Sequence, residues 1–298
     1  MSRGTTARSL ANWHFDDCRT PRRSALAITC LVWLGLALPA AAQETGLKIG
    51  GTGTTLETMR VLGAAFELDN PDVRVNVLSS LGSTGGIKAT LSGAIDIGVS
   101  ARPLTAAERA LGAKAIAYAR SPLVFATAKA NGATAITTTT LLEIYSGKRA
   151  SWPNGALIRM IMRPAGDVNS IVLKDMSAQM KAAVTAAEKR PGMLFAVTDQ
   201  EALEQLEKVP GALGASSLAE VMSRDSVLTA LRLNGIDPSP ESLADGTYPL
   251  QHTFYLVTGK TPSAAVSRFV DFVLSETGRK ILSETGHGLP DANPARQP

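Results

Sequence analysis

Cysteine and histidine are scarce in this sequence of 298 residues, which has two of the first and three of the second. Both cysteines, Cys18 and Cys30, precede residue 43, and only His252 and His287 follow it. The chain after residue 42 therefore has no disulfide and no thiol nucleophile. Because the two histidines lack metal-ligand spacing, we predict no metal site and interpret them as surface or interlobe residues.

The sequence also lacks the motifs of the common hydrolases and of dinucleotide-binding proteins. It has no Gly-x-Ser-x-Gly elbow, and no Ser-x-x-Lys that is followed by Lys-Thr-Gly. The pair Gly51 and Gly53 lacks the third glycine of a dinucleotide fingerprint, and no acidic residue for a ribose ends the strand expected at 73–77. We therefore expect no catalytic residues and no cofactor, and we do not interpret the chain as an enzyme.

A secretory signal peptide is predicted for residues 1–42. Arg19, Arg22 and Arg23 precede an uncharged, mainly apolar run at 25–38, and small residues at 40–42 precede Gln43. This run of 14 residues is shorter than the roughly 20 helical residues that cross a bilayer. We expect cleavage before Gln43 and a periplasmic location.

The basic character of the sequence belongs mostly to this leader. The whole chain has a formal net charge of +4 and a pI near 9.1. Residues 1–42 contain five Arg and two Asp, so the charge of the remainder is +1. A nucleic-acid partner is therefore not expected.

Strand and helix patterns alternate after the leader. Short alternating strands are expected at 47–49, 73–77 and 95–99, and helices between them at 54–66 and 82–91. Further extended segments are expected at 123–126, 158–162, 212–215 and 254–257, and a last helix at 264–277. Such alternation is typical of an α/β protein with a parallel sheet.

Capping-box spacing marks the expected helix starts. The Thr or Ser and Glu pairs lie at Thr54/Glu57, Thr105/Glu108, Thr140/Glu143, Thr198/Glu201 and Ser217/Glu220. Each precedes an apolar-periodic stretch, which strengthens the α/β assignment.

Two loops rich in Gly, Ser and Thr each follow an expected strand and open a helix, at 50–54 and 82–86. Such a turn points backbone N–H groups at one spot, and the helix dipole adds partial positive charge there. Together the two loops would suit an oxyanion. For either loop alone, the ordinary needs of turns and helix caps are a sufficient explanation.

Several segments in order resemble the periplasmic phosphate-binding proteins of ABC transporters, over nearly all of the chain after the leader. They are Gly50–Thr55, Gly82–Lys88, Asp96–Leu104, Ile144–Lys148 with Ser151-Trp152, Gly246–Leu250 and Phe269–Gly278. The resemblance implies a type II periplasmic-binding-protein fold, in which two crossover strands join two α/β lobes.

The resemblance also implies a domain organisation and partners. The first lobe would comprise residues 43–122 and 250–298, and the second lobe residues 123–249, with crossovers near 121–127 and 248–257. A small oxyanion, phosphate first, would bind between the lobes, and hinge closure would present the complex to ABC permease subunits in the inner membrane. We expect a monomer.

Ligand donors of the family fall on five positions of this sequence: Thr52, Thr54, Ser83, Thr84 and Arg163. The full candidate set adds their neighbours Gly53, Gly85, Arg102, Asp167 and Asn169. Two positions depart from the family pattern. Ala101 stands where the family has an acid that accepts the ligand proton, and Asp167-Val168-Asn169 replaces a Ser-Gly-Thr turn. Asp167 is then either a proton acceptor in the site or an ordinary turn or N-cap residue.

Two functions remain open at this point. The retained loop at 82–86 favours a transport receptor for phosphate or a related oxyanion. The altered turn at 166–169 favours a sensory or interaction protein with the same fold and a different or lost ligand.

Overall fold

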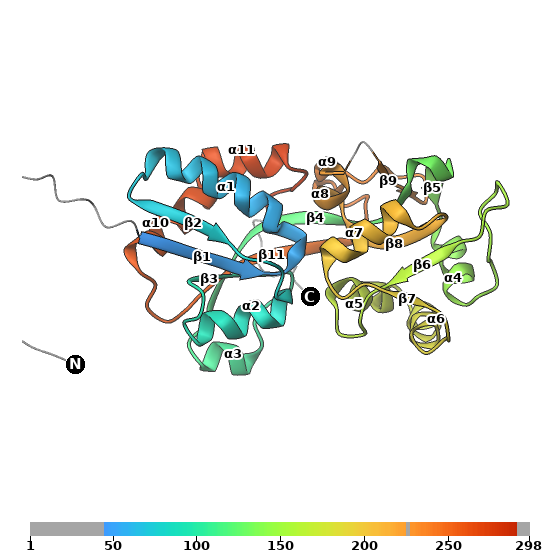
Figure 1. The fold of residues 1–298 in the computed structure, drawn as a ribbon, viewed down its shortest axis with the longest axis horizontal. Helices are drawn as coiled ribbons and strands as arrows, with labels where there is room; N and C mark the ends of the chain where they lie inside the picture. The colour runs from blue at the N-terminus through green and yellow to red at the C-terminus, as the bar shows by residue number, and fades with distance from the viewer. Residues whose placement is uncertain (1–44, 225–226, 291–298) are drawn as a thin grey trace, which may run out of the picture. The chain divides into compact units, whose positions relative to one another are not determined.

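A mixed sheet runs through the part of the chain that the structure describes (Figure 1). The structure is a computed structural model that describes residues 45–224 and 227–290, so the predicted signal peptide lies outside the described residues. The strand order is β2-β1-β3-β11-β4-β8-β6-β7, and β9 also pairs with β4. The strands of this sheet are β1 Thr45–Gly51, β2 Val73–Val77, β3 Ile97–Ser100, β4 Lys114–Ala128, β6 Arg159–Met162, β7 Leu194–Phe195, β8 Ala212–Ser217, β9 Leu228–Ala230 and β11 Gln251–Thr258.

Helices connect these strands and cover the sheet. They are α1 Leu56–Asp69, α2 Gly82–Leu91, α3 Ala106–Ala110, α4 Thr138–Tyr145, α5 Val168–Asp175, α6 Ala178–Glu188, α7 Asp199–Lys208, α8 Leu218–Met222, α9 Pro240–Ala244, α10 Ala264–Leu274 and α11 Glu276–Glu284. Two 3-10 turns, η1 Gly53–Thr55 and η2 Lys129–Asn131, and a small parallel pair, β5 Ala135–Ile136 with β10 Arg232–Leu233, complete the described elements.

The first lobe is built on β1, β2 and β3. β1 pairs in parallel with both neighbours, as the alternation of apolar residues predicts. Helices α1, α10 and α11 lie on one face of this part of the sheet, and α2 and α3 lie on the other (Figure 1). One apolar core unites the strands with the first and last helices, and it includes Ile49, Phe66, Val99, Phe254 and Phe269.

The second lobe is built on β6, β7 and β8, which are also parallel. Its separate core includes Phe125, Leu141, Ile161, Leu206 and Leu213. Helices α4 to α8 contribute to this core from the segments between the strands.

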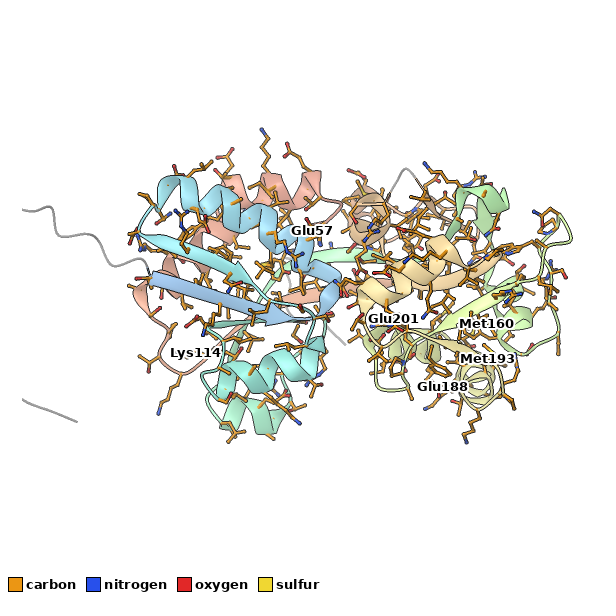
Figure 2. All side chains as sticks on the ribbon, in the orientation of Figure 1. Glu57, Lys114, Met160, Glu188, Met193 and Glu201 are labelled. Atoms are coloured by element: carbon orange, nitrogen blue, oxygen red, sulfur yellow. The ribbon has the colours of Figure 1, made fainter. Side chains whose placement is uncertain are left out.

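Two long antiparallel strands, β4 and β11, join the lobes. β4 begins in the first lobe at Lys114, whereas Met160 of β6 lies in the second (Figure 2). Residues 114–122 of β4 pair with β11, and residues 123–128 pair with β8 and β9. The protein therefore has the predicted type II architecture of two α/β lobes, while the residue boundaries of the lobes stay a prediction.

The predicted helix starts are partly correct. Capping boxes form at Thr105 and Ser217, and the Thr198 side chain accepts the N–H of Glu201. The prediction at Thr140 is wrong by three residues, since Thr137 is the N-cap of α4. At Thr54 it is wrong because this residue belongs to η1, and α1 begins after Thr55 without a side-chain cap.

The last predicted helix is two helices. Ser275 adopts an extended conformation between α10 and α11, and its hydroxyl accepts the N–H of Gly278. A Cβ on Gly278 would lie 2.3 Å from the carbonyl oxygen of Phe272. The break thus depends on a serine cap and on a glycine that permits the two helices to approach closely.

Within residues 45–224 and 227–290, no helix has the length and apolar character that a membrane crossing requires.

Candidate functional site

The loop after β1 brings Thr52, Gly53 and Thr54 to the edge of the first lobe. Gly51 precedes it with a φ of 149°, and a Cβ there would lie 1.9 Å from the carbonyl oxygen of Val99. Only glycine fits this turn. The hydroxyls of Thr52 and Thr54 are buried and 3.0 Å apart, so the loop presents hydroxyls and backbone N–H groups at one place.

The second predicted loop forms the start of α2 in the same lobe. Its N-cap position, Leu81, makes no side-chain cap, so first-turn N–H groups are left to other acceptors. Ser83 is buried and its hydroxyl accepts the N–H of Ala101 at 2.9 Å. Ser83 is therefore held in place by the segment that follows β3.

Arg102 contacts Thr84, but its guanidinium is paired with the carboxylate of Glu108. One guanidinium nitrogen donates to the Thr84 hydroxyl at 3.1 Å, and both terminal nitrogens bond Glu108, at 2.9 and 2.7 Å. Arg102 holds the pKa of the Glu108 carboxyl at about 2, well below its ordinary value. The charge of Arg102 is therefore largely balanced within the first lobe.

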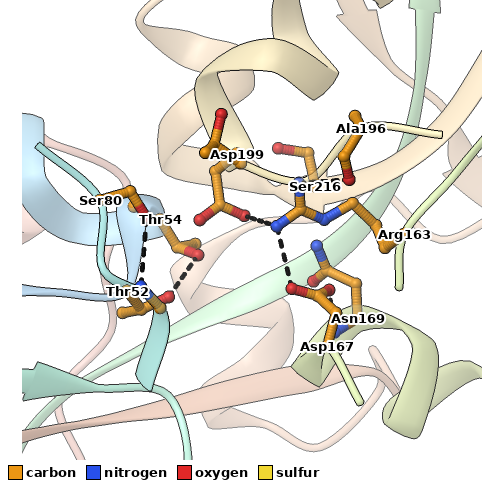
Figure 3. Close-up of polar contacts among 12 residues, drawn as sticks. Thr52, Thr54, Ser80, Arg163, Asp167, Asn169, Ala196, Asp199 and Ser216 are labelled. Atoms are coloured by element: carbon orange, nitrogen blue, oxygen red, sulfur yellow. Dashed lines mark hydrogen bonds and ion pairs between the residues drawn. The ribbon is translucent and has the colours of Figure 1, made fainter. Parts of the chain in front are cut away.

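Arg163 is the principal cation of the second lobe at this site. It follows β6, and its side chain is only 5% exposed. Its Nη2 donates to Asp167 Oδ2 at 2.9 Å and to Asp199 Oδ1 at 3.0 Å, and its Nη1 donates to the Ala196 carbonyl at 3.1 Å. Figure 3 shows the guanidinium between the two carboxylates, with Thr52 and Thr54 on the opposite side of Asp199.

Asp167 is an N-cap residue, one of the two alternatives that the sequence left open, and it also pairs with Arg163. It is the N-cap of α5, where Oδ1 accepts the N–H of Asn169 at 3.0 Å, and its other oxygen pairs with Arg163. Asn169 is buried, and its carboxamide oxygen lies 2.7 Å from Nε2 of His252. The side chain of Asn169 is thus engaged with β11.

A cleft of about 330 Å³ lies between these groups. Seven of the ten predicted site residues line it: Thr52, Ser83, Thr84, Gly85, Arg102, Arg163 and Asp167. Gly53 and Thr54 line an adjoining cleft of about 550 Å³. Asn169, in the first turn of α5, lines neither cleft and contacts His252 instead. The predicted residues therefore gather in one region that both lobes build.

Asp199 is the residue that the sequence interpretation missed. It begins α7, directly after the N-cap Thr198, and its carboxylate pairs with Arg163 and lies against the backbone of Gly53 and Thr54. Burial raises the pKa of Asp199 and Asp167 adds to the rise, while Arg163 and the two N–H donors oppose it. An acidic residue in a first helical turn is common, so nothing in the sequence distinguished this one.

Behind Asp199 lies a second buried acid, Glu220. Its Oε2 accepts the Ser216 hydroxyl at 2.8 Å and the Ser217 hydroxyl at 3.2 Å. Burial raises the pKa of Glu220 to about 8, and the nearby Asp199 contributes. Glu220 therefore holds a proton at neutral pH.

The two histidines are buried, so the surface alternative of their interpretation is wrong. His252 fits the interlobe alternative, since it lies on β11 and contacts Asn169 of the second lobe. Desolvation lowers the pKa of both His252 and His287 to about 4, which keeps them neutral. Among the residues that the structure describes, no three His, Cys, Asp or Glu side chains are grouped as a metal site.

Comparison with known proteins places this geometry in a family. Residues 38–277 match the model of the PBP superfamily domain. The phosphate-binding protein PstS of Borreliella burgdorferi is 26% identical over 251 residues, covering 82% of this chain and 89% of the relative. PstS of Bacillus subtilis is 25% identical over 254 residues, covering 81% and 79%.

Solved structures agree on the fold. A putative phosphate ABC transporter substrate-binding protein from Clostridium perfringens, with bound phosphate, has a TM-score of 0.71 at 23% identity, covering 83% of this chain and all of that one. An ABC-type phosphate transport receptor from Vibrio cholerae has a TM-score of 0.59 at 23% identity, with the same coverage. The chain therefore belongs to the PBP superfamily, and its fold is that of the type II periplasmic-binding proteins.

Proposed function

We propose that this protein is a periplasmic receptor that binds phosphate between its lobes and delivers it to an ABC permease, without catalysing a reaction. The observation that carries the proposal is Arg163, a buried guanidinium that faces two loops of hydroxyls and N–H groups across the cleft. A charge-assisted contact and helix-start N–H groups are the means by which proteins hold oxyanions. Relatives named for phosphate binding support the same conclusion.

The lobe boundaries that the sequence predicts, at 122/123 and 249/250, agree with this role. Each falls beside or within the segments β4 and β11 that join the lobes, so a hinge there would let the cleft open and close around a ligand. We further propose that the receptor is a monomer.

Phosphate is expected to bind and sulfate to bind much more weakly. Asp167 lines the cleft, and a carboxylate there repels a fully ionised anion but accepts the proton of hydrogen phosphate. Thermal unfolding with each anion tests this, since a ligand at 100 times its dissociation constant stabilises by about 2.7 kcal/mol. The same screen includes molybdate, amino acids and sugars.

The matched variant for that screen is Asp167→Asn. Asparagine also serves as an N-cap, so α5 keeps its start while the site loses a carboxylate. The variant should bind phosphate more weakly by calorimetry and discriminate less against sulfate. Unchanged affinity and selectivity would remove Asp167 from the ligand site.

A sensory role is the second candidate, and one observation favours it. Arg163 faces two carboxylates, so its charge is already balanced before any anion arrives. If no anion in the screen stabilises the protein, the sensory interpretation replaces transport.

Export is expected to remove residues 1–42. The basic start, the short apolar run and the alanines at 40–42 form a cleavable leader. Intact-mass measurement of protein recovered from the periplasm should place the N-terminus at or near Gln43. A soluble cytoplasmic pool that retains the leader would contradict this.

A further inference from the structure

The carboxylate of Asp199 bridges the two lobes. It belongs to α7 of the second lobe, yet it lies against the backbone of Gly53 and Thr54 in the first lobe, whose N–H groups favour its charged form. Next to it, Gln200 Nε2 lies 3.5 Å from the carbonyl oxygen of Gly53. The start of α7 is thus bonded across the cleft to the turn that follows β1.

This contact depends on the glycine at position 53. A Cβ there would lie 2.5 Å from Asp199 Oδ2 and 3.0 Å from Asp199 Cβ. Any other residue would push the carboxylate away from the two N–H groups. The carboxylate is also deeply buried, with its side chain 7% exposed.

Asp199 occupies the donors that an anion in this cleft would need. The N–H groups of the turn after β1 and the Arg163 guanidinium are groups of the kind that hold an oxyanion, and this one carboxylate lies against both. A bound anion would also add charge beside Asp167 and Asp199, which face a single guanidinium. In a poorly solvated cleft, such repulsion is strong.

We propose that Asp199 is an intramolecular anion that latches the two lobes together and must be displaced when an anionic ligand binds. The identity of that ligand as phosphate rests on the proposed function, whereas the latch itself does not. The latch lowers the apparent affinity, because only the fraction of molecules with free donors is competent to bind.

The displaced carboxylate has space to enter. The adjoining cleft of about 550 Å³ is lined by Thr198 and Gln200, which flank Asp199 in the chain, and by Gly53 and Thr54. Arg60 and Arg224 line it as well, and each is already paired with a carboxylate, Glu57 and Glu207 respectively. Rotation of Asp199 toward this side would clear the N–H groups and the Arg163 guanidinium.

The test compares Asp199→Asn with unmodified protein, both purified from the periplasm of an expression host. The amide keeps the size of the side chain but loses the charge that competes for the donors. Calorimetric titration with inorganic phosphate should give a dissociation constant lowered about tenfold or more. An unchanged or weaker affinity would overturn the displacement, because a residue that contacts the ligand favourably loses affinity when it is neutralised.

Glu204→Gln is the matched control. It removes the same charge from the same helix at an exposed position, and its affinity for phosphate should equal that of the unmodified protein. An equal gain in both variants would assign the effect to net charge and overturn the role of Asp199.

A measurement without any added anion tests the contact between the lobes independently of ligand binding. Small-angle scattering of Asp199→Asn should give a larger radius of gyration than that of unmodified protein, since the bonds to Gly53 and Thr54 are weakened. If phosphate binds neither protein, transport of phosphate fails as the function, and the scattering still decides the latch. Equal radii in that case would overturn it.

Discussion

Replacing Arg163 with alanine is expected to lower the free energy of unfolding by about 3–5 kcal/mol at neutral pH. The substitution leaves Asp167 and Asp199 facing each other without their shared cation, and the Asp199 side chain is almost fully buried. It also removes the donor to the Ala196 carbonyl. Denaturant titration measures the loss, and calorimetry should find no phosphate binding by the variant.

Arg159→Ala is the control for this experiment. Arg159 lies on the same strand, β6, but is exposed, and its removal should change stability by less than about 0.5 kcal/mol. Adding Asp199→Asn to Arg163→Ala should restore part of the loss, because the variant then has one buried carboxylate fewer. If Arg163→Ala lowers the free energy of unfolding no more than the control does, the ion pairs of Arg163 make no net contribution to stability.

The first lobe could be predicted from the sequence because its signals are local. Val73, Val75 and Val77 alternate along β2. The helix before β2 follows a glycine-rich turn, and the helix after it begins with glycine-rich sequence. Period-2 and period-3.6 patterns need no knowledge of distant residues. The family resemblance then supplied the arrangement of the two lobes, which the patterns alone do not determine.

Helix starts were predicted less well, because a cap depends on competing partners. Thr54 has the right spacing to Glu57, but its hydroxyl contacts Thr52 instead, and Glu57 pairs with Arg60. Glu143 likewise pairs with Arg149 rather than completing a box at Thr140. Spacing shows which contacts are possible, and the tertiary structure selects among them.

The sequence predicted which loops line the cleft, but it did not predict the contacts of Asp199 within it. Loops that resemble the family gave Thr52, Ser83 and Arg163, whereas Asp199 approaches from a helix far along the chain. Its role arises from the close approach of Gly53, which is a property of the assembled lobes. Single-sequence patterns carry no information about such a contact.

Glu220 is expected to make the protein less stable as the pH rises from 7.5 to 8.5. Its pKa is about 8 in the folded protein against an ordinary value of 4.5, so between these values the folded state holds a proton that the unfolded state has released. The free energy of unfolding then falls with increasing pH, by up to about 1.4 kcal/mol per pH unit. The stabilising contribution is complete below pH 4.5 and is lost as the pH rises through 8.

The window above pH 7.5 isolates this effect from the histidines. The pKa values of His252 and His287 are lowered to about 4 from an ordinary value of 6.5, so their neutral forms stabilise the fold above pH 6.5. That contribution is lost as the pH falls toward 4, which is the opposite dependence. Above pH 7.5, at least one unit above the ordinary histidine pKa, both are almost entirely neutral in the folded and unfolded states, and only Glu220 among these three exchanges a proton on unfolding.

Glu220→Gln should therefore remove the slope. Glutamine keeps an oxygen that can accept the Ser216 hydroxyl but has no proton to lose. The stability of the variant should therefore stay level between pH 7.5 and 8.5 and exceed that of the unmodified protein at pH 8.5. Denaturant titrations at several pH values in this window measure both curves, with Glu204→Gln as the control for a lost surface charge. Parallel curves for Glu220→Gln and the unmodified protein would mean that Glu220 is ionised throughout the window, and that the Ser216 and Ser217 hydroxyls stabilise a buried carboxylate rather than a carboxylic acid.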